Sequence, residues 1–420
     1  MPRANSKLRQ RALSALALFG VGLIPLIGSA SSAAAQDVSS QQWYLNAMQA
    51  EGMWGVSKGK GITVAVIDTG VNAEVPELRG QVLKGVDVSR TPTDVREDKN
   101  GHGTNMAALI AGTGAGDGIQ GLAPGAKVLP IKAMVSGSDV AGPLMAKAIR
   151  YAVDHGARVL NISLGSAGVP SQFNETQHAV DYALQKGALV FAAVGNTGDA
   201  ANSAEFPASL RGVVGVGAID REGKAAKFST TGDQVALVAV GSEIVGHCLT
   251  KTGSMCMSRG TSQATAIASA SAALIWSKHP KWTNNQVLRV MMQTAAKPES
   301  GEIPSSYVGY GSIRPRKVLL DGEGDPGPAN VNPLLAREGA TKPDPSASAS
   351  ASKSPSTDPQ STPTATDDKK GDKKNVAEPK KNDDNSSTLW IAIGVGAAVL
   401  LAAAVAIVLV RRRGSASVGL

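Results

Sequence analysis

The chain has 420 residues, 42% of them hydrophobic, and a formal net charge of +8. Four basic residues precede an apolar N-terminal stretch and three form the run Arg411–Arg413, so the rest of the chain is close to neutral. This distribution gives no reason to expect nucleic-acid binding. His178, His247 and His279 have no carboxylate or cysteine at metal-ligand spacing, so we also expect no zinc site.

The N-terminus has the pattern of a secretory signal peptide. Its basic residues are followed by an apolar stretch over about 12–27, and Ala33-Ala34-Ala35 offers a cleavage site. We expect a signal peptide over 1–35; the alternative, a retained anchor, is disfavoured by the short apolar core. Residues 36–60 would then form an N-terminal extension, too short to be an independently folded pro-domain.

Residues 62–67 predict the first buried strand, because they are almost continuously apolar and rich in β-branched types. The strand leads into Asp68-Thr69-Gly70. In an open α/β sheet the carboxyl ends of parallel strands face the functional crevice, so Asp68 is a candidate for orienting a catalytic partner. Taken alone, this motif more often marks a turn.

His102 is the candidate base. It lies in Asn100-Gly101-His102-Gly103-Thr104, and the apolar run over 106–111 predicts a helix with His102 on its first turn. Imidazole is well suited to take a proton from a hydroxyl near neutral pH when another group fixes its tautomer. We expect Asp68 to be that group.

Strand and helix signals alternate through the middle of the chain. We expect strands over 127–134, 158–164 and 188–194, and helices over 140–154 and 175–186. This alternation predicts an α/β fold with a mainly parallel sheet between two helical layers. Further on, Thr283 and Gln286 form a capping box that opens a helix running through Met292.

Ser262 is the candidate nucleophile, at the point where a glycine turn enters an alanine-rich helix. A hydroxyl there lies beside unpaired backbone N–H groups and the positive end of the helix dipole, which favours a developing oxyanion. Asn196, after the strand that ends at Gly195, is the candidate second oxyanion donor. Taken alone, Gly260-Thr261-Ser262 would more often be a helix N-cap.

Together these motifs resemble those of the subtilisin-like serine proteases, in that family's order, over about residues 43–320. The motifs are Asp68-Thr69-Gly70, Gly101-His102-Gly103-Thr104, Ser163-Leu164-Gly165, Gly195-Asn196 and Gly260-Thr261-Ser262. The resemblance implies a three-layer subtilisin-like catalytic domain at 61–320 that hydrolyses peptide bonds with an Asp-His-Ser triad. It also implies that Ser163, Leu164 and Gly165 pair with the substrate backbone, with Gly165 opening the S1 side.

The α/β-hydrolases use the same three residue types in another pattern. Their nucleophile motif is Gly-x-Ser-x-Gly, whereas Ala264 holds the last position here, and their serine comes first in the chain. Two positions depart from the usual subtilase pattern: Ala266 replaces a proline, and Asn105 stands where many members have a second histidine. We expect both to affect specificity and local packing more than the chemistry.

Cys248 and Cys256 are the only cysteines, and export makes a disulfide the default over two free thiols. We expect it to rigidify the approach to Ser262. Subtilases often carry structural calcium, but the aspartates available here show no calcium-loop spacing, so no cofactor or metal is expected. These aspartates are Asp94, Asp98, Asp117 and Asp199.

The C-terminal part predicts a membrane anchor. Residues 321–387 are rich in Pro, Ser, Thr and Lys and are expected to form a linker, whose part from about residue 340 is a disordered stalk. Residues 388–410 are uncharged and long enough for a transmembrane helix. The arginines that follow would keep 411–420 as a cytoplasmic tail, which places the catalytic domain outside the cell membrane.

This whole arrangement resembles the mycosins, the membrane-anchored subtilases of type VII secretion. The resemblance is also carried by Gln42-Trp43-Tyr44-Leu45 and Trp54-Gly55-Val56. It implies a tethered endopeptidase that acts on polypeptides and has secretion-complex proteins as partners. The alternative is a structural or binding component of such a complex with incidental proteolysis, which an intact triad disfavours but does not exclude.

Overall fold

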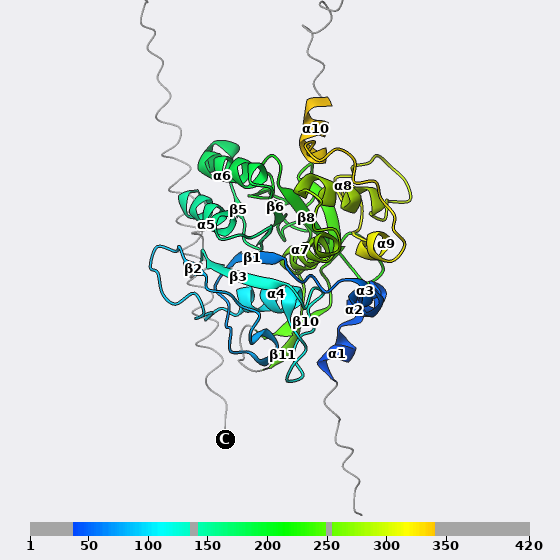
Figure 1. Ribbon diagram of the computed structural model, residues 1–420. Helices are drawn as coiled ribbons and strands as arrows, with labels where there is room; N and C mark the ends of the chain where they lie inside the picture. Colours follow the sequence, from blue (N-terminus) through cyan, green and yellow to red (C-terminus); the bar gives the residue numbers. More distant parts are fainter. Residues whose placement is uncertain (1–36, 135–141, 249–253, 341–420) are drawn as a thin grey trace, which may run out of the picture. The chain divides into compact units, whose positions relative to one another are not determined.

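The structure, a computed structural model, describes residues 37–134, 142–248 and 254–340. Within them seven strands form one sheet in the order β2-β3-β1-β4-β6-β8-β9, and all neighbours are parallel (Figure 1). The predicted mainly parallel sheet is therefore confirmed. The strands are β1 Thr63–Asp68, β2 Val86–Asp87, β3 Lys127–Lys132, β4 Val159–Ile162, β6 Leu189–Ala193, β8 Val214–Ile219 and β9 Val235–Val240.

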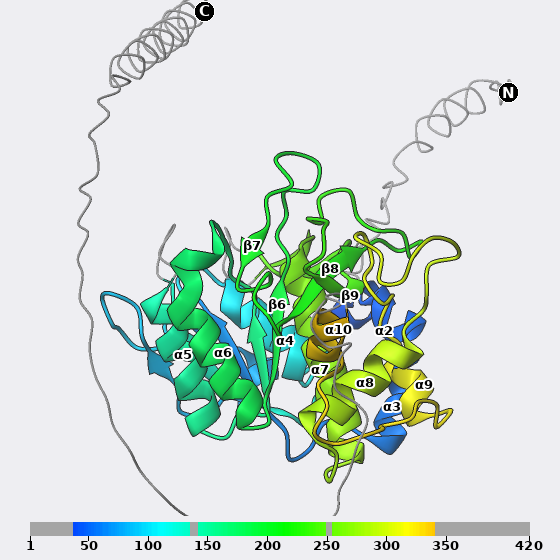
Figure 2. The same cartoon turned by 90° about the horizontal axis from the view of Figure 1, so that it is seen from above.

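Helices cover both faces of this sheet (Figure 2). The helices α5 (Pro143–Asp154) and α6 (Asn174–Gln185) cover one face, and α4 (His102–Ala111), α7 (Thr261–Lys278) and α8 (Asn284–Thr294) cover the other. Successive side chains of β1 point to opposite faces of the sheet and so pack against different helical layers. Val64 and Val66 join the core under α7, whereas Ala65 and Ile67 join the core under α5 and α6.

The helix α7 is buried at the centre of the domain. Its residues from Thr261 to Trp276 are all buried, and it packs on five strands of the sheet as well as on α4. A helix apolar on every side is typical of such a buried position, and its many alanines let the neighbours approach closely. The first turn of α7, which carries Ser262, is therefore held firmly against the sheet.

The N-terminal extension folds into the core of the domain. It forms α1 (Val38–Gln41), α2 (Trp43–Ala47) and α3 (Ala50–Val56). Tyr44 and Met53 are fully buried in the core shared with α4 and α7. The Gln42 side chain donates to the Gln120 carbonyl and accepts from the Gln120 N–H, both at 2.8 Å. The described part of 36–60 is thus integral to the domain.

Replacing Tyr44 with alanine is expected to lower the free energy of unfolding by about 3–5 kcal/mol, because it empties a fully buried aromatic site. The milder Tyr44→Phe removes only the hydroxyl that accepts from Gln42 and should cost about 1 kcal/mol. Chemical denaturation measures both values. Tyr307→Ala, at an exposed tyrosine, is the control, and an equally small effect at Tyr44 would contradict the packing described above.

The domain extends past the boundary expected at residue 320. After α9 (Pro315–Leu319) the chain runs along α8 and forms α10 (Pro333–Ala340). The Arg289 guanidinium on α8 donates to the carbonyls of Pro326, Pro328 and Val331. Other side chains of α8 and its N-cap also bond to this segment, including Gln286, which donates to the Gly327 carbonyl. A segment whose glycines and prolines suggested a linker is therefore held against α8, and any linker begins beyond the predicted residue 321.

Smaller elements complete the described chain. Two antiparallel pairs lie outside the main sheet, β5 (Ser166–Ala167) with β7 (Glu205–Phe206) and β10 (Ile244–His247) with β11 (Met255–Ser258). There are two short 3-10 turns, η1 Pro76–Leu78 and η2 Pro170–Phe173. The expected signal peptide, stalk, transmembrane helix and cytoplasmic tail lie outside the described residues. Among the helices described, none has the length and apolar character needed to cross a membrane.

Candidate active site

The predicted site residues meet at the carboxyl edge of the sheet. Asp68 ends β1, and Asn196 follows β6. Facing them are the first turns of two helices, with His102 on α4 and Ser262 on α7. Four motifs that are widely separated in the sequence are thus brought to one edge by the parallel topology, as expected for an open α/β sheet.

Asp68 and His102 form a short polar contact. His102 Nδ1 lies 2.7 Å from Asp68 Oδ1, which also accepts from the Thr69 N–H at 2.8 Å. Asp68 is fully buried, whereas the His102 side chain is 23% exposed. Because an ionised carboxylate can only accept, Nδ1 carries the proton and Nε2 remains free to take one.

Asp98 connects the loop after β1 to the first turn of α4, a role the sequence did not reveal. Its Oδ1 accepts from Thr69 Oγ1 and Gly101 N, both at 2.8 Å. Its Oδ2 accepts from the Thr104 N–H at 2.8 Å and the Thr104 hydroxyl at 2.6 Å. With four donors satisfied, Asp98 fixes His102 opposite Asp68.

Two of the aspartates considered as calcium ligands accept hydrogen bonds from the protein. Within the described residues, no group of three or more His, Cys, Asp or Glu side chains could hold an ion. Asp98 is occupied by the donors of the His102 loop, and Asp117 accepts from the Val38 N–H.

The environment of His102 raises its pKa above the ordinary 6.5. Burial favours the neutral ring and lowers the pKa, but the negative charge of Asp68, its hydrogen bond and the charge of Asp98 together outweigh that effect. The imidazolium that forms during proton transfer is therefore stabilised by two carboxylates, one in contact and one nearby.

Asp98→Asn should shift the acid limb of the kcat/KM pH profile to lower pH. The substitution removes a negative charge that raises the pKa of His102, so the neutral base forms at lower pH. It also weakens the bonds to Thr104 and should lower the free energy of unfolding by about 2–3 kcal/mol. Asp94→Asn, in the same loop, is the control. An unmoved acid limb in a folded Asp98→Asn protein would contradict this role.

Ser262 lies at the start of α7 with a hydroxyl that does not yet point to the base. Its side chain is 7% exposed, and Oγ donates to the Ser163 carbonyl at 3.2 Å. A rotation about the Cα–Cβ bond would turn Oγ away from that carbonyl. Such relaxed geometry is common when no substrate is bound. The Ser262 N–H, on the first helical turn, has no partner within α7 and is available to a ligand.

Asn196 is exposed and oriented by its neighbour on α7. Its Oδ1 accepts from the Thr261 N–H at 2.8 Å and from the Thr261 hydroxyl at 3.2 Å. Because both partners are donors, the carbonyl end of the amide must face them, and the Nδ2 end is left to donate elsewhere. Asn196 and the Ser262 N–H can thus supply two donors to one oxyanion.

The segment Ser163–Gly165 is fixed to the start of α7. Ser163 Oγ donates to the Ser262 carbonyl at 3.3 Å and accepts from Asn161 Nδ2 at 3.0 Å. The Leu164 side chain is buried in the core beneath α5 and α6, so it cannot contact a ligand directly. This segment can therefore offer a peptide its backbone.

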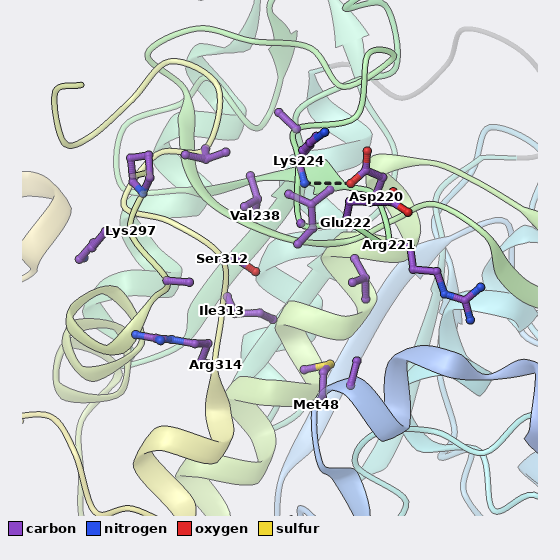
Figure 3. Close-up of a pocket in the computed structure, with 18 of the residues that line it drawn as sticks. Met48, Asp220, Arg221, Glu222, Lys224, Val238, Lys297, Ser312, Ile313 and Arg314 are labelled. Carbon is purple, nitrogen blue, oxygen red and sulfur yellow. Dashed lines mark hydrogen bonds between the residues drawn. The ribbon is translucent and has the colours of Figure 1, made fainter. Parts of the chain in front are cut away.

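A pocket of about 750 Å³ lies apart from these residues (Figure 3). Its lining comes from the N-terminal helices and from the loops around Asp220 and Arg314, and it includes Met48 and Ile313. None of the predicted catalytic residues lines it. It is therefore not the catalytic cleft.

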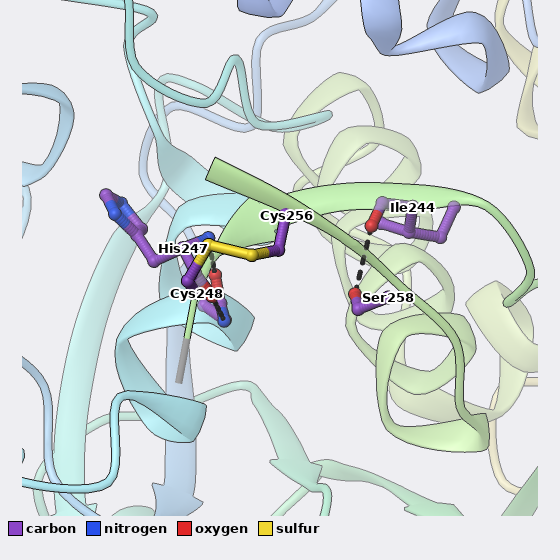
Figure 4. Close-up of a disulfide and its surroundings, with 6 residues drawn as sticks. Ile244, His247, Cys248, Cys256 and Ser258 are labelled. Atoms are coloured by element: carbon purple, nitrogen blue, oxygen red, sulfur yellow. Dashed lines mark hydrogen bonds between the residues drawn. A yellow bond between two sulfur atoms is a disulfide. The ribbon is translucent and has the colours of Figure 1, made fainter. Parts of the chain in front are cut away.

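The hairpin β10–β11, which precedes Ser262, carries the predicted disulfide between Cys248 and Cys256 (Figure 4). Asn105 on α4 clasps the hairpin: its Nδ2 donates to the His247 carbonyl at 2.8 Å, and its Oδ1 accepts from the His247 N–H at 2.6 Å. The His247 ring contacts the buried Glu77 at 2.6 Å. Asn105, which stands where many subtilases have a second histidine, thus joins α4 to the β10–β11 hairpin.

The fold and this arrangement of side chains define a serine peptidase of the subtilisin type. Residues 59–311 match the model of the Subtilase family, and the chain belongs to that family. It is 34% identical to thermitase of Thermoactinomyces vulgaris over 285 residues, which are 67% of this chain and 96% of thermitase. It is 38% identical to the thermophilic serine proteinase of Bacillus sp. strain AK1 over 264 residues, which span 62% of each chain and so less than two thirds of that proteinase.

Solved structures of mycosins are also similar to this chain. MycP1 from Mycobacterium smegmatis has 26% identity and a TM-score of 0.58, covering 69% of this chain and 86% of that one. The MycP3 protease from the type VII (ESX-3) secretion system has 31% identity and a TM-score of 0.57, covering 66% and 87%. The resemblances to subtilisin-like proteases and to mycosins are therefore confirmed, and the chain is classed with the serine-type endopeptidases.

Proposed function

We propose that this chain is an exported, membrane-tethered serine endopeptidase that cleaves polypeptides through an acyl-enzyme on Ser262. The observation that carries the proposal is the 2.7 Å contact between Asp68 and His102. The helix that carries His102, α4, packs on α7, whose first turn carries Ser262 and bonds to Asn196. These are the nucleophile, base, orienting group and oxyanion donor that acyl transfer needs.

The reaction begins with an extended peptide whose backbone lies along 163–165. Ser262 Oγ turns from the Ser163 carbonyl, passes its proton to His102 Nε2 and attacks the scissile carbonyl carbon. The Ser262 N–H and Asn196 Nδ2 donate to the resulting oxyanion. Asp68 stabilises the imidazolium, which then gives its proton to the leaving amine.

Deacylation repeats these steps with water. His102 Nε2 takes a proton from a water molecule, the hydroxide attacks the acyl carbon, and the proton returns to Ser262 Oγ as the acid product leaves. The same two donors hold the second oxyanion. Each proton thus passes through one ring nitrogen, and no cofactor or metal enters the proposed sequence.

Fluorophosphonate labelling of the detergent-solubilised full chain tests the mechanism. We expect one adduct, on Ser262, that is lost in Ser262→Ala and retained in Ser300→Ala, a control at an exposed serine. An adduct on another residue, or none on a folded sample, would refute the assignment.

The cellular setting we propose is the outer face of a membrane beside a type VII secretion system. Support comes from the likeness to MycP1 and MycP3 and from the predicted signal peptide at 1–35 and transmembrane helix at 388–410. Deleting 388–420 should release the protein into the medium, as immunoblotting of cell fractions would show. Continued membrane retention would argue against this anchor.

The alternative is a structural or binding role in a secretion complex. Its support is that MycP1 is described as an essential component of a type VII secretion system, a description that does not specify proteolysis as the essential contribution. Cells carrying Ser262→Ala separate the two roles. Loss of processing with normal export would favour the structural role.

A further inference from the structure

The carboxylate of Glu205 lies beside the two segments that hold the scissile bond in the proposed mechanism. Glu205 is in β7, which pairs with β5 directly after Gly165, with Ala167 opposite Glu205. A side chain at Gly165 would collide with Glu205 Oε2, and one at Gly195 would collide with Oε1. The carboxylate therefore fills the space between these two glycines.

Among the described residues, no side chain or backbone group neutralises this carboxylate. Within the described part of the chain, its oxygens accept no hydrogen bond and form no ion pair, although the side chain is half-buried. The neighbouring Ser209 bonds only to the backbone carbonyl of Glu205. Burial raises the pKa of Glu205, which is the expected effect of desolvation without a partner.

An unpaired carboxylate at a partly buried position costs free energy that an uncharged side chain would avoid. The pairing of β7 does not require a glutamate at position 205. Glutamine or alanine would serve equally well there, because Glu205 contributes only its backbone carbonyl to the bonds with Ser209. Within the described residues, the charge therefore has no stabilising partner. A positively charged group on a bound ligand would be a stabilising partner for the Glu205 carboxylate.

The bound peptide would bring its side chain to this place. The scissile carbonyl has to lie at Ser262 and Asn196, and the backbone before it lies along 163–165. The side chain of the residue just before the scissile bond would therefore lie near Gly165 and Gly195, next to the Glu205 carboxylate.

We propose that Glu205 is the specificity-determining residue of this peptidase and selects lysine or arginine immediately before the scissile bond. The ammonium or guanidinium group would pair with the carboxylate while its methylene stem packs against the neighbouring backbone. This inference rests on the proposed proteolytic function and adds the class of substrate to it.

Matched fluorogenic peptides that differ only at this substrate position test the proposal on the detergent-solubilised full chain. We expect kcat/KM for lysine to exceed that for methionine, which has a similar length and no charge, by at least about tenfold. Glu205→Gln should lower kcat/KM for lysine by about 10- to 100-fold and leave the methionine peptide within a few-fold. Glu205→Lys should instead favour a glutamate peptide.

Asp199→Asn is the control for net charge, because Asp199 is an exposed acidic residue after Asn196 and should leave the lysine preference unchanged. Fluorophosphonate titration counts active sites in every variant and identifies any that fail to fold. A wild-type preference for apolar residues, or equal losses for all peptides in labelled Glu205→Gln, overturns the inference and leaves the proposed function intact. Absence of both labelling and hydrolysis in the wild type overturns both.

Discussion

Ser262→Ala is expected to lower kcat/KM for a peptide substrate by about 10⁶-fold, the scale of loss on removing this serine from a subtilisin. The variant keeps the base and the oxyanion donors but has no group to form the acyl-enzyme. Its fold should be unaffected, because the Ser262 hydroxyl makes one hydrogen bond, to the Ser163 carbonyl. Progress curves with a fluorogenic peptide measure the loss, and thermal melting measures the stability.

Ser300→Ala provides the matched control for this experiment and should retain full activity. If Ser262→Ala kept more than about a hundredth of the wild-type activity in a sample free of contaminating protease, another residue would have to be the nucleophile. The assignment of the site would then be wrong.

Asp68→Asn is expected to lower kcat by about 10⁴-fold with little change in the positions of the other groups. Asp68 accepts the Nδ1 proton of His102 at 2.7 Å, which leaves Nε2 as the base. A carboxamide that turns its NH₂ toward the ring stabilises the opposite tautomer, in which Nε2 already carries a proton. Steady-state kinetics measure the loss, and NMR of the labelled ring identifies the tautomer.

The same substitution has a separate effect on stability. Because the pKa of His102 is raised in the folded protein, the His102–Asp68 pair contributes stability that is fully present below about pH 6.5 and is lost as the pH rises through the folded pKa. Asp68→Asn should flatten this part of the curve of unfolding free energy against pH. An unchanged pH dependence would mean that the two side chains are not coupled.

The parts of the site that the sequence predicted depend on local patterns. β-branched runs gave the strands, and the residues directly after them, Asp68 and Asn196, are placed by strand topology alone. Likewise, the glycine turn before an alanine-rich run gave the helix start at Ser262. A parallel sheet converts such local signals into a shared edge, which is why distant motifs could be expected to meet.

The parts that were missed depend on contacts between segments far apart in sequence. Glu77 and His247, 170 residues apart, have no common local pattern. Asp98 lies in an irregular loop, and its role depends on hydrogen-bond donors that only the folded chain brings to it. Glu205 belongs to a two-residue strand, which is too short for any periodicity to reveal.

Domain limits were predicted less well for a related reason. Helices as short as α2 and α3 carry too few turns to show an apolar stripe, so the burial of Tyr44 and Met53 could not be expected. At the other end of the domain, Arg289 donates hydrogen bonds to carbonyls of a glycine- and proline-rich segment. The composition of that segment gives no indication of this contact.

A crystal structure of the protein with a peptide boronate bound would test the central claim most directly. We predict a covalent bond from boron to Ser262 Oγ, with His102 Nε2 within hydrogen-bonding distance of that oxygen and one boronate oxygen accepting from the Ser262 N–H and Asn196 Nδ2. A boronate bound elsewhere, or to Ser262 with His102 turned away from it, would contradict the proposed relay.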